Sequence, residues 1–400
     1  MPKKLEFFRS KAYNSWTMSQ SEYLETHPFL NFQPDLRRAG PRFWALLGEA
    51  KSKSEHLSNA PLLPRTFHEL HQIYLAKGAA ATTAIEGNTL SEKEVRGVLE
   101  GSFKAPPSKA YLQQEVQNIL DASTTLLVRD GKKTLSVSDL LAFNRQALEK
   151  LPFEPEVTPG DFRLHRVTVG GYFPPEPRFL PELLERFVHW MGEFSTRIAP
   201  GMEMHTAVLK AILAHLYLVW IHPFGDGNGR TARLLEAQIL LEVGFPTPAV
   251  HLLSNFYNQT RSRYYRELDR AGRSRDVLPF VEYALEGLVD GLKEQISFVQ
   301  AQQLEVLWRN LIHETFAGKH GEAAHRRREL ALALRIEDGP VALKRLPLLT
   351  PELAQHYAQL SSKTLTRDVN ELERLDLVRL DKRGIEGRFE RVLELLTFQK

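Results

Sequence analysis

The sequence contains no cysteine among its 400 residues. This absence excludes disulfide bonds, thiolate nucleophiles and zinc sites built on sulfur, and it fits a reducing compartment best. The chain also lacks an excess of either charge, with 52 Lys and Arg against 49 Asp and Glu. Charge alone therefore gives no reason to expect binding to nucleic acid or to a membrane surface.

Long apolar runs are missing as well. The longest, residues 207–221, is interrupted by Lys210 and His215 and falls short of the roughly 20 residues that a membrane span needs. Residues 1–16 are positively charged but have no apolar stretch that leads to a small-residue cleavage site. We therefore expect no membrane association and a cytoplasmic protein. No GxxxxGK run occurs, which excludes a P-loop as the source of nucleotide binding.

Helical periodicity dominates what is present, and it predicts a mainly α protein. Apolar residues recur three and four apart in residues 67–84, 111–127, 181–191, 206–220 and 234–243. Glycine and paired prolines in residues 101–108 oppose a helix, which predicts a boundary between an N-terminal helical segment, 1–100, and a central block, 101–315. Within that block, β-branched residues on one side of Gly170-Gly171 and aromatics and prolines on the other predict a short hairpin.

The last part of the chain, residues 326–400, follows a charged, glycine-containing segment that suggests a hinge. A serine cap at 361–362 precedes a predicted helix, and predicted strands 378–380 and 388–395 flank a turn at 381–384. This order resembles a winged helix-turn-helix. Residues 321–400 contain fifteen Lys and Arg against thirteen Asp and Glu, which leaves DNA binding open without favouring it. Solvation explains Lys363 and Arg367 more simply than contacts to DNA phosphates do.

Residues 222–233, HPFGDGNGRTAR, lie between two strongly apolar helical stretches and carry residue types suited to phosphate chemistry. Gly225, Gly227 and Gly229 permit backbone angles that other residues avoid, so consecutive amides can turn toward an anion. The helix that we expect to restart at about Gly229 directs its unpaired amides and the positive end of its dipole at the same place. The sequence therefore predicts a loop that cradles a phosphate.

Four charged or titratable side chains surround this loop. Arg230 and Arg233 are three residues apart on one helical face, where each can grip phosphate oxygens with a forked contact. Asp226 offers the hard carboxylate oxygen that Mg²⁺ accepts when phosphates and waters complete its coordination. His222 titrates near neutral pH, so it can take a proton from an attacking hydroxyl. These residues predict a site for Mg²⁺ and a polyphosphate.

Residues 222–233 resemble the signature of the Fic family, which reads His, Pro, Phe, any residue, acid, Gly, Asn, Gly, Arg, two spacers, Arg. The resemblance covers about residues 60–300, including Arg163 and, more weakly, Arg261 and the pair Tyr264 and Tyr265. It implies a helical bundle with a β-hairpin flap, and transfer of AMP from Mg·ATP to a Ser, Thr or Tyr hydroxyl of a target protein.

The same resemblance implies a role for each matching residue. His222 would be the general base, Asp226 the Mg²⁺ ligand and Asn228 a contact to the α-phosphate. The amides of Gly227 and Gly229 would line the phosphate-binding nest.

Arg230 and Arg233 would hold the outer phosphates of ATP. The family branch that phosphorylates its targets carries lysine at the position of Gly229. The glycine here therefore favours AMP transfer.

A second match lies upstream, where Thr82, Glu86 and Gly87 end a predicted helix at about 66–86. It resembles the family's inhibitory motif, whose glutamate pairs with the second signature arginine, here Arg233, in the place of the ATP γ-phosphate. A carboxylate there removes one phosphate clamp and adds repulsive charge. The resemblance leaves a second direction open, because the same glutamate could position water for removal of AMP from a modified target.

The hairpin with Val167, Val169, Gly170 and Gly171 resembles the family's flap, which binds a target by adding the target's backbone as a strand. Such recognition leaves the target's identity open: it could be this protein itself, and the family often forms homodimers. A competing hypothesis is a winged-helix DNA-binding regulator whose core only senses ATP.

Other titratable and aromatic residues have simpler explanations. His205 and His215 fit helix packing better than zinc binding, because no second acid or His-Glu-x-x-His run accompanies them. Tyr264 and Tyr265 could wall an adenine ring or belong to the core.

Overall fold

The computed structural model describes residues 22–62, 64–128, 134–196, 200–334 and 339–397. The chain divides into unit 1, which ends at Ile296, and unit 2, which begins at Ser297. The division falls inside helix α12 (Leu278–Thr315), earlier than the predicted boundary near residue 315. Unit 1 contains both the predicted N-terminal segment and most of the predicted central block, so their separation near residue 100 stays a prediction. Residues 1–16, on which we based the expectation about export, lie outside the described residues.

Unit 1 consists mainly of helices, and it contains all five periodic stretches as helices. These five are α3 (Pro64–Ile85), α5 (Ala110–Val128), α7 (Leu180–Thr196), α8 (Glu203–Ile221) and α9 (Asn228–Glu242). The unit also contains α2 (Pro41–Ser58), α4 (Glu92–Leu99), α6 (Val137–Ala147), α10 (Leu252–Gln259), α11 (Arg261–Ser274) and the start of α12. Short 3₁₀ helices lie at Pro28–Asn31, Pro107–Lys109, Pro177–Phe179 and Thr247–Ala249. The mainly α prediction is confirmed.

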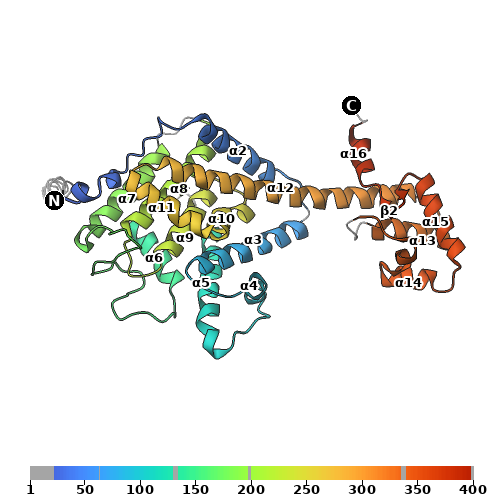
Figure 1. Ribbon diagram of the computed structural model, residues 1–400, viewed down its shortest axis with the longest axis horizontal. Helices are drawn as coiled ribbons and strands as arrows, with labels where there is room; N and C mark the ends of the chain where they lie inside the picture. Colours follow the sequence, from blue (N-terminus) through green and yellow to red (C-terminus); the bar gives the residue numbers. More distant parts are fainter. Residues whose placement is uncertain (1–21, 63, 129–133, 197–199, 335–338, 398–400) are drawn as a thin grey trace, which may run out of the picture. The chain divides into compact units, whose positions relative to one another are not determined.

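Helix α8 runs through the centre of unit 1 and packs against α2, α7 and α9 (Figure 1). Its length and composition would suit a membrane span, but most of it is buried inside the unit. Ile212, Leu216 and Leu218 are all 0% exposed, as expected for a helix that is apolar on every face. The two interruptions that the sequence showed, Lys210 and His215, are buried as well.

His215 belongs to a buried polar network that fixes α8 to its neighbours. Its Nδ1 lies 3.0 Å from Glu236 Oε2 on α9, and its Nε2 lies 2.9 Å from the Tyr264 hydroxyl on α11. The Tyr257 hydroxyl donates to the other oxygen of Glu236 at 2.9 Å. Buried polar groups are tolerated when they have polar partners, and here the Tyr257 and Tyr264 hydroxyls form hydrogen bonds while Nδ1 of His215 makes a close polar contact with Glu236. The network makes His215 and Tyr264 core residues.

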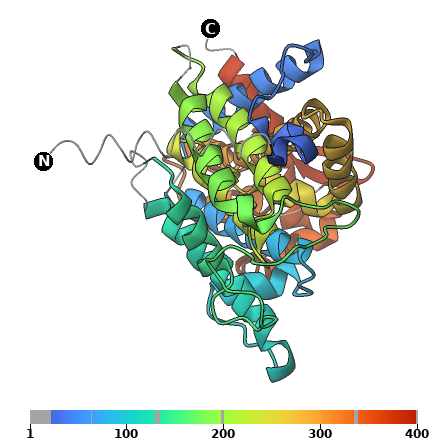
Figure 2. The same cartoon turned by 90° about the vertical axis from the view of Figure 1, so that its left-hand side faces the viewer.

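The connection between α6 and α7, green in Figures 1 and 2, has little regular structure and contains the predicted hairpin. Val169 and Tyr172 form an isolated antiparallel bridge, with both backbone hydrogen bonds at 2.9 Å. Gly170 and Gly171 make the two-residue turn, and Gly170 has φ +60°, a left-handed angle that glycine adopts without steric cost. The hairpin is therefore real but only one bridge long.

Unit 2 contains α13 (Glu322–Ala333), a 3₁₀ helix at Leu343–Leu348, α14 (Pro351–Tyr357), α15 (Ser362–Arg374), strands β1 (Val378–Asp381) and β2 (Gly384–Gly387), and α16 (Glu390–Thr397). Trp308 and Ile312, from the last turns of α12, are buried in its hydrophobic core. This packing explains why the division precedes residue 315. The strands pair antiparallel from Val378–Gly387 to Asp381–Gly384.

The predicted second strand at 388–395 was wrong. The turn at 381–384 is so tight that the chain re-enters the sheet at Gly384, whose amide donates to Asp381 Oδ1 at 3.1 Å. The strand is complete by Gly387, and residues 390–397 form α16 instead. Phe389 contacts Trp308 edge-on at a centroid distance of 4.8 Å, and Val392 is 5% exposed. Packing on the unit 2 core therefore holds this segment as a helix.

Candidate active site

His222 ends α8 and begins the loop that leads into α9. It is the helix C-cap, with a left-handed φ of 48°, and its amide donates to Leu218 O at 2.9 Å. Its carbonyl accepts a hydrogen bond of 2.8 Å from Nε of Arg163, a side chain that is 2% exposed. The same guanidinium donates to the carbonyls of His165 and Pro175, which flank the hairpin. One buried arginine thus fixes His222 and the base of the hairpin together.

The imidazole of His222 is neutral at physiological pH. Burial lowers the pKa of His222 from 6.5 to about 4, although the carbonyl of Val219 and the carboxylates of Glu86 and Asp226 favour the charged form. Nδ1 lies 3.3 Å from Val219 O, which can only accept a hydrogen bond. This contact assigns the proton to Nδ1 and leaves Nε2 able to accept one.

Two asparagine side chains hold the loop after His222 through hydrogen bonds to its backbone. Asn228 accepts from the amide of Phe224 at 3.0 Å and donates to its carbonyl at 2.9 Å. Asn144, on α6, donates to Asp226 O at 2.9 Å. Sequence reasoning missed Asn144. It gave Asn228 a contact to the α-phosphate, which stays a prediction, whereas in this structure the side chain braces the loop.

The glycines of the loop meet different demands. Gly227 has φ +76° and precedes α9, and its carbonyl accepts from the Thr231 hydroxyl at 2.8 Å. Gly225 has an ordinary angle but approaches Val157, 3.1 Å from where a Cβ would lie. A Cβ on Gly229 would collide with Glu86 Oε1. One glycine therefore serves the backbone turn and the other two serve close approach.

The second arginine of the loop, Arg233, is joined to the end of α3. Its Nη2 donates to Glu86 Oε1 at 2.5 Å and to Thr82 O at 3.0 Å, and its Nε donates to the Thr82 hydroxyl at 2.5 Å. Arg233 is 3% exposed, and the Glu86 side chain is 28% exposed. Burial favours a neutral acid, but the charge of Arg233 prevails and lowers the pKa of Glu86. The structure thus brings together the three residues that the sequence linked.

The first arginine, Arg230, has two carboxylate partners. Its Nη1 donates to Glu115 Oε1 at 2.7 Å and its Nη2 donates to Asp226 Oδ1 at 3.0 Å. Glu115 lies on α5 and also accepts from the Asn88 amide at 2.9 Å. Burial raises the pKa of Glu115, and Arg230 opposes that shift. Sequence reasoning missed Glu115 and Asn88. The signal that could have indicated Glu115 was the presence of one acid on the apolar face of α5.

Asp226 is the one exposed acid of the loop, with its side chain 47% exposed. Its Oδ1 accepts from Arg230 and, at 2.5 Å, from the amide of Gly227. A single accessible carboxylate fits Mg²⁺, which commonly takes one or two protein carboxylates and completes its octahedron with phosphates and waters.

The predicted flap residues lie on an exposed part of the hairpin. Val169 is 36% exposed and Phe173 is 69% exposed. The hydroxyl of Tyr172 donates to Trp220 O at 2.8 Å, two residues before His222. Phe173 was not among the predicted residues; of those that were, Gly170 and Gly171 are exposed as well and Val167 is half-buried. The hairpin is therefore tethered beside His222 while its tip stays accessible.

Tyr264 and Tyr265, two residues of the weaker resemblance, differ in how deeply they are buried. Tyr264 is 2% exposed and belongs to the His215 network, whereas Tyr265 is 46% exposed. The Tyr265 hydroxyl donates to Ile85 O at 3.3 Å, which places this ring at the end of α3 beside Glu86. Arg261 lies 6.0 Å from its ring centroid.

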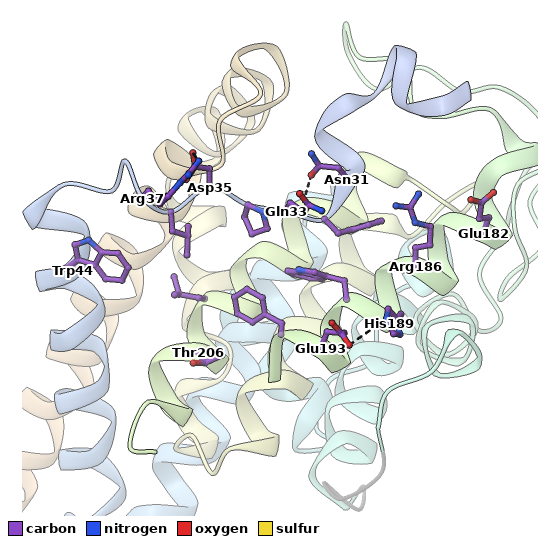
Figure 3. A pocket seen from close by; sticks show the side chains of 16 residues that line it. Asn31, Gln33, Asp35, Arg37, Trp44, Glu182, Arg186, His189, Glu193 and Thr206 are labelled. Atoms are coloured by element: carbon purple, nitrogen blue, oxygen red, sulfur yellow. Dashed lines mark hydrogen bonds and ion pairs between the residues drawn. The ribbon is translucent and has the colours of Figure 1, made fainter. Parts of the chain in front are cut away.

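A cavity of about 1060 Å³ lies elsewhere in unit 1 (Figure 3). The described residues that line it come from residues 31–37, Trp44, α7 and the start of α8, and residues 222–233 are not among them. This cavity is therefore separate from the loop that follows His222.

Residues 134–240 match the model of the Fic/DOC family. This part of the chain is similar to the Fic/DOC domain. The protein adenylyltransferase fic-1 of Caenorhabditis elegans is 30% identical over 263 residues, which cover 65% of this chain and 48% of the relative. The protein adenylyltransferase Fic of Drosophila virilis is 35% identical over 207 residues, which cover 50% and 39%. The chain thus spans about half the length, or less, of these curated relatives.

Solved structures agree with the Fic fold. A fragment of Fic-1 from C. elegans has a TM-score of 0.53 and 28% identity, covering 65% of this chain and 73% of that one. A Fic family protein from Desulfovibrio desulfuricans has a TM-score of 0.55 over 87% of this chain and 93% of its own, at 23% identity. This second likeness shows a shared fold. Glu86, Asn88 and Glu115 lie outside the residues matched by the family model.

Proposed function

We propose that this protein belongs to the Fic family and is a protein adenylyltransferase, which transfers AMP from ATP to a hydroxyl group of a target protein. The observation that carries the proposal is a neutral histidine, His222, held at the start of a glycine-containing loop that two arginines flank. The names of the curated relatives support the same activity. The modified target, which includes this protein itself as a candidate, and homodimer formation stay open.

The reaction assigns a task to each group of the loop. Nε2 of His222 accepts the proton of the target hydroxyl, and the hydroxyl oxygen forms a bond to the α-phosphorus. The bond from the α-phosphorus to the bridging oxygen breaks, and pyrophosphate leaves. The amide of Gly229 would face the phosphates, while Arg230 and Arg233 would stabilise the negative charge on the outer phosphates. The amide of Gly227, also predicted to line the nest, donates to Asp226 Oδ1 in this structure.

Asp226 would hold Mg²⁺ in this proposal. Bound Mg²⁺ would neutralise charge on the phosphates and orient them. The chain's own contribution is the position of the carboxylate, which the amide of Gly227 and the guanidinium of Arg230 fix.

Autoinhibition by Glu86 is part of the proposal. The carboxylate occupies Nη2 of Arg233, which would otherwise bind a phosphate, and its charge repels the phosphate itself. A glycine at this position removes both effects, and the two contacts of Arg233 with Thr82 still hold the guanidinium in place.

The decisive experiment compares the unaltered protein with Glu86→Gly in the presence of ATP and Mg²⁺. We expect the variant, but not the unaltered chain, to gain the mass of one or more AMP groups, or to label a protein in a lysate of the native host. Intact-mass analysis separates AMP transfer from phosphate transfer. A mass gain of one phosphate would contradict the proposal.

The control is His222→Ala in the Glu86→Gly background. We expect labelling to fall by about 10²- to 10⁴-fold, the usual contribution of a general base. Labelling that survives the loss of His222 would defeat the mechanism, even if AMP were transferred.

We also propose that unit 2 is a winged helix-turn-helix. Helices α14 and α15 are separated by four residues, and the β1–β2 hairpin follows α15 directly. A backbone bridge between Val341 and Ile385 adds a third short strand position to this hairpin. The order of these elements supports the winged-helix arrangement.

A further inference from the structure

Arg230 differs from Arg233 in that both of its terminal nitrogens are bound to carboxylates. Arg230 is 5% exposed, and its partner Glu115 is 8% exposed. The second partner, Asp226, is the acid that the proposed function assigns to Mg²⁺. A guanidinium that bound Asp226 alone could take both of its oxygens in a forked pair. Whatever holds Arg230 elsewhere therefore affects whether Asp226 can bind a metal.

We propose that Glu115 is a positioning residue of the nucleotide site, which holds Arg230 on its far side and so leaves Asp226 available for Mg²⁺. The inference rests on the proposed function and concerns the same site.

The two terminal nitrogens of the Arg230 guanidinium bind different acids. Nη1 of Arg230 lies 2.7 Å from Glu115 and Nη2 lies 3.0 Å from Asp226, and the described residues give Nε no hydrogen-bond partner. Only Oδ1 of Asp226 is engaged by Arg230. Glu115 thus keeps Arg230 from closing a two-oxygen contact on Asp226.

Asn88 fixes Glu115 from the opposite side. Its amide nitrogen lies 2.9 Å from Glu115 Oε2 and 2.9 Å from Leu112 O, and its Oδ1 accepts from the amide of Leu90 at 2.9 Å. Asn88 follows Glu86 by two residues, so one short segment contacts Arg233 through Glu86 and Arg230 through Asn88 and Glu115. The end of α3 therefore reaches both arginines by separate chains of contacts.

The test measures binding of ATP in a background that cannot turn over, Glu86→Gly with His222→Ala. Calorimetric titrations with ATP, in excess Mg²⁺ and in EDTA, give the factor by which the metal tightens nucleotide binding. We expect Glu115→Gln to reduce that factor about tenfold, the usual scale for one charge-assisted hydrogen bond. Binding in EDTA should change by less than about threefold.

The matched control is Glu236→Gln, which removes another buried carboxylate, one that is 1% exposed and pairs with His215. We expect this variant to leave the Mg²⁺ factor unchanged. If Glu115→Gln leaves the factor unchanged, or weakens binding equally in EDTA, the inference is wrong.

A double-mutant cycle keeps the inference testable if Glu115→Gln loses stability. Because Glu115 acts through Arg230, Glu115→Gln should have no further effect on the Mg²⁺ factor in an Arg230→Gln background. The same cycle on thermal unfolding without nucleotide should show coupling between Glu115 and Arg230, and additive shifts would contradict the inference. Failure of ATP to bind to the background variant would overturn the proposed function instead. The double-mutant cycle on thermal unfolding would still show whether Glu115 and Arg230 interact.

Discussion

The loop that follows His222 and the hairpin beside it lie close together, yet they are held very differently. The loop has buried side chains bonded to its backbone from Asn144, Arg163 and Asn228. The hairpin has one bridge, between Val169 and Tyr172, and exposed residues on both sides of it. In the proposed function, the loop carries out the chemistry and the hairpin accepts another chain, so the difference would separate a part whose geometry must not vary from a part that must adapt.

Physical requirements explain the contrast. Proton transfer and phosphate binding depend on atoms placed within fractions of an ångström, which needs a preorganised loop. Binding a target as an added strand depends on free backbone groups and makes few demands on side chains. If this comparison is correct, changes in the loop should alter the rate of the chemistry, and changes in the hairpin should alter the binding of the target.

Among the changes that test how the loop and the hairpin are held, the largest effect should come from Asn144→Ala in the Glu86→Gly background. It removes the bonds from Asn144 to Asp226 O and to the amide of Gly160. We expect AMP transfer to fall about 100-fold, because the loop shifts, and the free energy of unfolding to fall by about 2–3 kcal/mol. Labelling rates and denaturant titrations measure the two effects. Asn59→Ala, which removes one exposed bond to Glu55 O, is the control, and an equal loss in both variants would break the comparison.

The second prediction concerns pH. Because the pKa of His222 is lowered to about 4 by burial, the folded protein keeps this group neutral where the unfolded chain, near 6.5, gains a proton. Its contribution to stability is therefore complete above pH 6.5 and is lost as the pH falls toward 4.

The same shift predicts the activity profile of Glu86→Gly. Removal of the Glu86 carboxylate lowers the pKa of His222 further, since that charge favours the protonated form. We expect the transfer rate to stay level down to about pH 5 and to fall below about pH 4 by up to tenfold per pH unit. An acid limb centred at pH 6.5 would show that the loop does not bury His222 as described.

The smallest effect should come from the hairpin. Gly170→Ala places a Cβ on a residue with φ +60°, which costs about 1 kcal/mol. We expect labelling of a target protein to fall two- to fivefold through a higher KM, with ATP binding unchanged. Gly171→Ala is the matched control, because Gly171 has no left-handed angle and open space around it. A large loss of kcat in either variant would mean that the hairpin, like the loop, sets the chemistry.

The sequence predicted much of this site because its residues are contiguous. Residues 222–233 carry the histidine, the glycines, the acid and both arginines within twelve positions of one chain segment, and local rules about loops and helix termini apply to them directly. The sequence also indicated Glu86, because Glu86 belongs to a recognisable motif. It did not indicate Asn144 or Glu115, because each lies on a different helix and only packing brings it to the loop.

The error at the second strand of unit 2 has the same origin. The composition of residues 388–395 is compatible with a β-strand. The sequence contains no signal that shows how short the turn is, and therefore none that shows at which residue the second strand begins and ends. Phe389 and Val392 pack on the unit 2 core, and this packing favours a helix over a strand in residues 390–397. Tertiary packing overrides a weak local preference there.

By itself, the sequence determined the helical class and the long buried helix before the loop, and it indicated the groups that we propose to react, since apolar periodicity and a twelve-residue motif are local properties. Only the tertiary structure decided that His222 is neutral, that Arg233 is bound by Glu86 and that Arg230 is shared between Glu115 and Asp226. A pKa and an ion pair depend on burial and on distances between remote segments, and neither exists until the helices pack.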